Sequence, residues 1–71
     1  MTSDELKDLI DSIKVEANYD HKAGNTTTTY KLPEEALNEE VIEALEANFE
    51  HYKSCTVTGN TLTLEHPDVD D

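Results

Sequence analysis

The chain of 71 residues contains no arginine, glutamine or tryptophan, and all five of its basic residues are lysines. Acidic residues number 17, so the formal net charge is -12 with the histidines neutral. A surface of that charge repels the phosphates of nucleic acids and anionic lipids, and it attracts basic proteins and cations. We therefore expect no direct binding to nucleic acid or to a membrane.

Cysteine is scarce as well. Cys55 is the only one, which excludes a disulfide within the chain, although small secreted domains usually contain several. The N-terminal residues lack the basic and then apolar order of a signal peptide, and no apolar run approaches the ~20 residues of a membrane-spanning helix. These absences predict a soluble protein of a reducing compartment, the cytoplasm.

Large apolar residues are few. Leucine, isoleucine, valine and phenylalanine together number 15 of 71, just above the fraction of about 20% below which a highly charged chain is usually disordered. The length allows one domain with a thin core. The periodicity described next favours a folded domain over residues 1–66, followed by an acidic tail, 67–71, that we expect to be flexible.

A first helix is predicted from the start of the chain. Thr2 and Glu5 have the spacing of a capping box, and Gly24 with Asn25 is the first strong stop signal. Apolar residues recur between them at steps of three and four: Leu6, Leu9, Ile10, Ile13 and Ala17. Residues 14–22 also alternate as a strand would, but no stop signal lies near Lys14. We therefore expect the helix to reach about residue 21.

The rest of the chain reads as strand, helix and hairpin. Residues 26–32 are rich in threonine and end before a proline, as a strand does. Asn38 is placed to cap a second helix that runs to about Phe49 or Tyr52. Residues 54–65 read as a hairpin whose two-residue turn, Gly59 and Asn60, suits type II′. That turn places Cys55 opposite Leu64 and Val57 opposite Leu62.

These elements predict a small two-layer α+β domain of order α-β-α-β-β. We expect a three-stranded, mostly antiparallel sheet, with the last strand in the centre and both helices on one face. Six threonines would point away from the helices: Thr27, Thr29, Thr56, Thr58, Thr61 and Thr63.

A row of carboxylates is the strongest functional signal. Four glutamates of the second predicted helix recur at steps of four, three and four: Glu39, Glu43, Glu46 and Glu50. This spacing puts them on one exposed face, Glu35 lies close enough in sequence to extend the row, and no lysine lies at pairing distance within the helix. Because the regular spacing is similar to that of a phosphate backbone, the row could occupy a groove built for nucleic acid on another protein. The alternative is a solvated face.

A secondary acidic face is expected on the first helix, made of Asp4, Asp8 and Asp11 and relieved in part by Lys7 and Lys14. The favoured function is a non-enzymatic acidic binding protein that engages a basic, nucleic-acid-handling protein surface, as a nucleic-acid mimic or an inhibitor would. A structural or assembly protein with homotypic contacts through its sheet is the rival class. A third interpretation is that the charge serves solubility only.

Catalytic and metal-binding patterns are missing. The chain has no glycine-rich phosphate loop and no nucleophile at a recognisable spacing from a base. The possible metal ligands have no finger-like spacing: His21, His51, His66 and Cys55. We expect no enzyme activity, no cofactor and no metal.

Residues 24–66 resemble a pattern that recurs among small phage-encoded proteins. The run TTTTYKLPEEALNEEVIEALEANF, followed by TVTGNTLTLEH, places a strand ending in Leu-Pro before a capped acidic helix and a Gly-Asn hairpin. The resemblance implies a phage origin, a place in the host cell cytoplasm and a host-directed or virion-associated role. The partner would then be a basic protein of host or phage, and the protein itself is expected to be a monomer.

Overall fold

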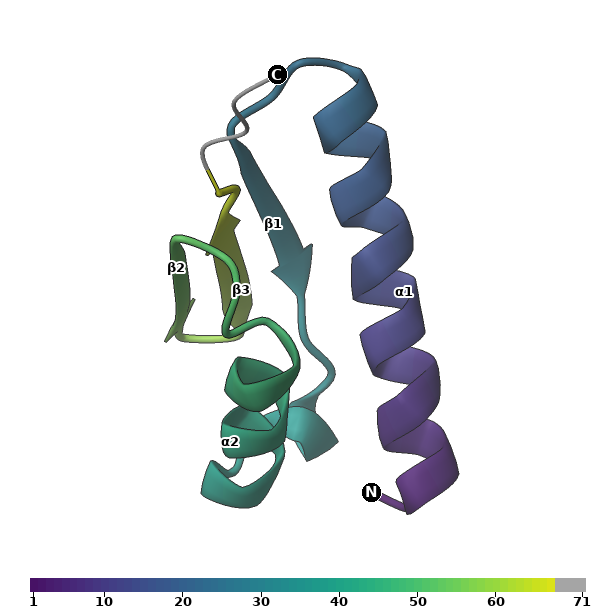
Figure 1. The fold of residues 1–71 in the computed structure, drawn as a ribbon. Coiled ribbons are helices and arrows are strands. Elements are labelled where there is room, and N and C mark those ends of the chain that lie inside the picture. The colour runs from purple at the N-terminus through teal and green to yellow at the C-terminus, as the bar shows by residue number, and fades with distance from the viewer. Residues whose placement is uncertain (68–71) are drawn as a thin grey trace.

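A computed structural model describes residues 1–67 of the protein, and the elements follow the expected order α-β-α-β-β (Figure 1). They are α1 (Ser3–Lys22), β1 (Thr27–Lys31), the short 3-10 helix η1 (Glu34–Ala36), α2 (Glu39–Asn48), β2 (Ser54–Thr58) and β3 (Thr61–Glu65). The strand order is β1-β3-β2, and both pairs are antiparallel. The predicted α+β class is therefore confirmed. Most of the predicted tail, residues 68–71, lies outside the described residues.

The predicted cap of α1 is present. The Thr2 hydroxyl accepts from the Glu5 backbone N–H at 3.2 Å, and the Glu5 carboxylate accepts from the Thr2 backbone N–H at 2.8 Å. The helix continues without interruption to Lys22, so the ambiguous segment 14–22 is helical. It ends where Gly24 adopts a φ of 83°, a conformation that side chains with a Cβ rarely adopt.

The hairpin has the predicted register. Thr58 pairs with Thr61, Val57 with Leu62 and Cys55 with Leu64. Gly59 has a φ of 62°, and within residues 1–67 no residue other than glycine has a positive φ. This is the pattern of a type II′ turn, whose twist matches that of the paired strands.

One apolar cluster holds both helices against the same face of the sheet. Leu45 from α2 and Leu62 from β3 are completely buried, as is Ile13 from α1. The other buried members are Leu9, Ile10, Leu32, Ala36, Val41, Phe49 and Leu64. The opposite face of the sheet carries the six threonines, of which Thr61 and Thr63 are half-buried and the other four are exposed. None of the helices in residues 1–67 combines the length and apolar character needed to cross a bilayer.

The second helix ends at Asn48, earlier than the sequence predicted. Phe49 leaves the helical conformation at φ -118°, and its N–H is shared between the carbonyls of Leu45 and Glu46. A further turn, with the Tyr52 N–H donating to the Phe49 carbonyl, sends the chain towards β2. The fully buried Phe49 ring therefore lies at the point where the chain leaves the helix.

Candidate functional site

The predicted acidic row lies on the exposed side of α2 and continues past both of its ends. Glu39, Glu43 and Glu46 belong to α2, and all three are exposed. Glu50 is exposed too, but it lies in the turn that follows the helix. Glu35 lies in η1 and is also exposed. Of the four glutamates predicted to share a helical face, only Glu39, Glu43 and Glu46 therefore lie in α2.

Asn38 connects the two acidic segments. Its side-chain oxygen accepts from the Val41 backbone N–H at 3.0 Å and so caps α2. Its side-chain amide donates to the Glu35 carbonyl at 3.1 Å, which fixes the end of η1 to the start of α2. One residue thus both caps the helix, as the sequence predicted, and bonds to the backbone of Glu35.

The segment that carries this surface supplies no cation of its own. Residues 32–50 contain seven glutamates and no lysine, arginine or histidine, and all seven side chains are exposed. The ion pair found in residues 1–67 joins Lys53 to Glu65 at 3.6 Å and involves none of them. We call this segment the acidic surface: Glu34, Glu35, Glu39, Glu40, Glu43, Glu46 and Glu50.

The secondary acidic face is exposed on the first half of α1. Asp4, Asp8 and Asp11 are all exposed there. Figure 1 shows the beginning of α1 and the whole of α2 at the same end of the molecule. Both predicted acidic groups therefore contribute to the negative potential of one end of the domain.

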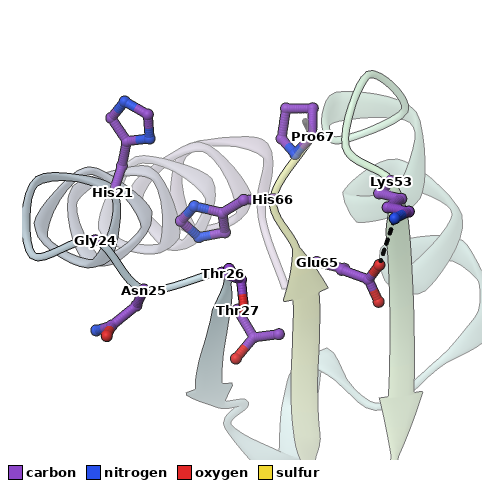
Figure 2. Close-up of a pocket in the computed structure, with 9 residues that line it drawn as sticks. All are labelled: His21, Gly24, Asn25, Thr26, Thr27, Lys53, Glu65, His66 and Pro67. Carbon is purple, nitrogen blue, oxygen red and sulfur yellow. Dashed lines mark ion pairs between the residues drawn. The ribbon is translucent and has the colours of Figure 1, made fainter. Parts of the chain in front are cut away.

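A second site, which the sequence analysis did not predict, lies at the other end of the sheet. A pocket of about 500 Å3 opens there between the end of α1 and the ends of the strands (Figure 2). Its polar lining includes His21, Asn25, Lys53, Glu65 and His66. Figure 2 shows His66 reaching from the end of β3 towards the last turn of α1.

Buried hydrogen bonding organises this second site. The His66 Nε2 atom lies 2.6 Å from the hydroxyl of Thr28, which is only 2% exposed. The Asn25 amide, and after it the Thr28 hydroxyl, hold the pKa of Asp20 below its usual value by donating hydrogen bonds to the carboxylate. Which of the two atoms donates in the bond between Thr28 and His66 depends on the tautomer of the imidazole.

Strand periodicity was the signal for this contact. Leu62, Leu64 and His66 alternate along one face, and β1 pairs Thr28 with Leu64, so Thr28 and His66 project to the same side. The His66 imidazole also contacts the ring of Tyr52 edge-on, with 5.8 Å between the ring centroids. It stacks with the ring of His21, with 6.3 Å between the centroids. These contacts tie α1, β1 and β3 together.

Cys55 is not an activated nucleophile. Burial, and secondly the nearby Glu46 carboxylate, raise the pKa of its thiol. The thiol is therefore protonated at neutral pH, and the thiolate is the form that reacts and binds metals.

The two sites offer different chemistry. The pocket is a hydrogen-bonded junction whose threonine hydroxyl is out of reach of solvent, and residues 1–67 contain no group of three or more side chains placed to hold a metal ion. The acidic surface presents unneutralised charge to solvent, which suits recognition of another macromolecule. Comparison of the chain with models of protein families, with curated proteins and with solved structures gave no match.

Proposed function

We propose that this protein is a non-enzymatic acidic binding protein whose acidic surface engages a basic surface of another protein. The observation that carries the proposal is the stretch 32–50, in which seven exposed glutamates occur without one basic residue. Like charges at helical spacing destabilise a helix by a few tenths of a kcal/mol per pair. A helix with a purely structural role would intersperse lysines, as α1 does with Lys7 and Lys14.

A nucleic-acid-handling protein is the kind of partner we propose. Carboxylates three or four residues apart on α2 recur about every 5 Å along the helix axis, and each strand of a duplex carries a phosphate about every 3.4 Å. A groove lined by lysines and arginines for a phosphate backbone would therefore meet charge of the right sign at similar spacing. The pattern shared with small phage proteins is consistent with an inhibitor or nucleic-acid mimic directed at a host or phage factor.

The test begins with capture of binding proteins from a lysate at low and high salt, followed by kinetics with the purified partner. Replacing Glu43 and Glu46 by glutamine keeps side-chain length and much the same helix propensity. Since exposed charges act mainly on the rate of encounter, we expect association at low salt to slow roughly threefold to tenfold and to lose salt dependence.

The matched control changes two carboxylates that belong to neither acidic group, Glu16→Gln with Asp70→Asn, which alters net charge by the same amount. It should leave association nearly unchanged. If the Glu43→Gln/Glu46→Gln variant binds the partner as the parent protein does, the acidic surface is only a solvated face and the proposal is wrong.

A further inference from the structure

The strand β2 is an open edge of the sheet. It pairs with β3 on one side, and Figure 1 shows no described element beyond it on the other. In a two-residue hairpin the residues that flank the turn, here Thr58 and Thr61, exchange hydrogen bonds, and the bonding then alternates along the strand. The backbone groups of Cys55 and Val57 therefore point away from β3.

The pairing on the far side of β3 agrees with this assignment. The Leu32 N–H donates to the Asn60 carbonyl, and the His66 N–H donates to the Thr26 carbonyl. If that alternation continues along β1, its backbone bonds to the N–H and C=O groups of Leu62 and Leu64. The backbone groups of the other β3 residues then bond to β2. Two N–H and two C=O groups on the outer side of β2 are thus available to another strand.

The edge lacks the devices that normally prevent strand addition. Exposed edges usually carry a lysine, a proline or an inward-pointing charge. The other edge strand, β1, ends in Lys31, and α1 packs beside it. β2, with the sequence SCTVT, contains none of these within its own bounds, although Lys53 directly precedes it and pairs with Glu65 of β3. Residues 54–64 form the longest run without a charged residue in a chain with 22 charged residues (17 acidic and 5 basic).

Carboxylates flank the inner side of this edge. Cys55 and Val57 are half-buried on that side, and Glu46 is close enough to Cys55 to affect its thiol. Glu50 lies exposed in the turn that leads to β2. A second copy that paired edge to edge would bring its own α2 carboxylates to the same side of the joined sheet, where like charges repel. A basic segment would instead meet opposite charge.

We propose that the outer edge of β2 binds an extended segment of the basic partner as a fourth strand. Backbone hydrogen bonds to Cys55 and Val57 supply the pairing, and lysine or arginine side chains lie beside Glu46 and Glu50. Strand addition gives affinity through the main chain and specificity through alternate side chains. This inference rests on the proposed function and adds its binding mode.

The probe is a synthetic acetylated heptapeptide of alternating lysine and threonine, compared with the same peptide carrying glutamate in place of lysine. In the parent protein, the lysine peptide should slow hydrogen exchange at the Cys55 and Val57 amides at least tenfold, and the glutamate peptide should not. Protection of the Thr27 and Thr29 amides instead would place the strand on the β1 edge and overturn the proposal. This measurement needs no variant.

The variants are Val57→Pro and Thr29→Pro, and because Val57 packs against the core whereas Thr29 is exposed, both proteins must first show the dispersed amide spectrum of the parent. Each removes an N–H that points away from β3, so neither breaks the existing ladder, and edge strands tolerate proline at such positions. Val57→Pro should weaken binding of the lysine peptide at least tenfold, whereas Thr29→Pro should bind as the parent does. Equal binding by both variants would contradict the inference.

The outcomes separate this inference from the proposed function. If Glu43→Gln/Glu46→Gln weakens binding of the partner but Val57→Pro does not, the proposed role of the acidic surface is correct and the proposed role of the β2 edge is wrong. If Val57→Pro alone weakens it, strand addition does not require the acidic surface, and both the proposed function and the basic segment are wrong. Concentration-dependent dimers of the parent that Val57→Pro abolishes would assign the edge to a second copy and overturn the proposal.

Discussion

At the scale of single residues, His66 and its neighbours decide how α1 is attached to the sheet. The Thr28 hydroxyl is buried between an imidazole and the side of α1 that carries Asp20, and a buried hydroxyl without partners would be destabilising. Asn25 adds a second connection, because its amide donates to the Asp20 carboxylate at 2.9 Å and its backbone N–H to the Asp20 carbonyl at 2.8 Å. The helix end and the start of β1 are therefore held by the same aspartate.

Asp20 makes this attachment dependent on pH. Its pKa in the folded protein is lower than the ordinary value of 3.8, so the ionised form favours the folded state. That contribution is present above pH 3.8 and is lost as the pH falls through the lowered pKa. We expect Asp20→Asn to be less stable than the parent at pH 6 and equally stable below the lowered pKa.

Urea unfolding of both proteins across this pH range measures the difference. Acid also reduces the overall negative charge, but it does so in both proteins, so the comparison isolates Asp20. Asp11→Asn, an exposed aspartate on the same helix, serves as the control and should show no such convergence. A constant difference between the Asp20→Asn variant and the parent at every pH would contradict the assignment.

At the scale of elements, the hairpin and α2 build the core that α1 covers. The inner faces of β2 and β3 follow the alternation of the strands, and α2 contributes Val41, Leu45 and Phe49 to the same cluster. A domain this small buries only about 60–65% of its unfolded surface. Each fully buried leucine therefore accounts for a large share of the total stability.

Truncation of Leu45 or Leu62 tests that dependence. Both side chains are 0% exposed, as their positions in the sequence predicted. Leu45→Ala and Leu62→Ala should each lower the free energy of unfolding by ~2–5 kcal/mol, because they remove apolar contacts and leave a cavity. Val15→Ala, at a position 53% exposed, should change it by less than about 0.5 kcal/mol. Denaturant titration measures these differences. If all three variants lost a similar free energy of unfolding, the assignment of the core residues would be wrong.

The features that the sequence predicted depend on residues that are close together in the chain, whereas those that it missed depend on residues that are far apart. The hairpin register was predictable because the Gly59 turn and the alternation of β2 and β3 are local signals that agree. The bond between Thr28 and His66 was not, because it joins residues 38 apart and depends on the register between β1 and β3. The exposed glutamates of α2 were predicted from helical spacing, but Glu50 lies beyond the helix because the backbone leaves the helical conformation at Phe49.

At the scale of the whole molecule, charge is distributed unevenly along a domain 38 Å long and 18–19 Å across. The acidic surface lies at one end, and His21, Lys53 and His66 surround the pocket at the other (Figures 1 and 2). The Debye length is about 8 Å at physiological ionic strength, so the two ends act on their surroundings separately. If the proposed function is correct, a basic partner is steered towards the end that carries α2.

We predict that the chain is a folded monomer despite its net charge of -12, and that salt stabilises it. Screening weakens the repulsion among carboxylates in the folded state, so the free energy of unfolding should rise between about 0.02 M and about 0.3 M sodium chloride. The Glu43→Gln/Glu46→Gln variant should gain less from salt. Urea titration and sedimentation measure both properties. An amide spectrum without dispersion at neutral pH and moderate salt would show that the chain does not fold alone.

The strand order has a consequence for how the chain reaches its fold. The β2–β3 hairpin closes over two residues and is expected to form within about 1–10 μs, whereas β1 reaches β3 only after about 30 intervening residues have been brought into a loop. Docking of β1 is thus the late step, and it carries α1 into place because only a short turn separates the two. Until then the hairpin has two open edges, one on β3 and one on β2, so during folding β3 presents the same vacant pairing positions to its own first strand as to any competing one.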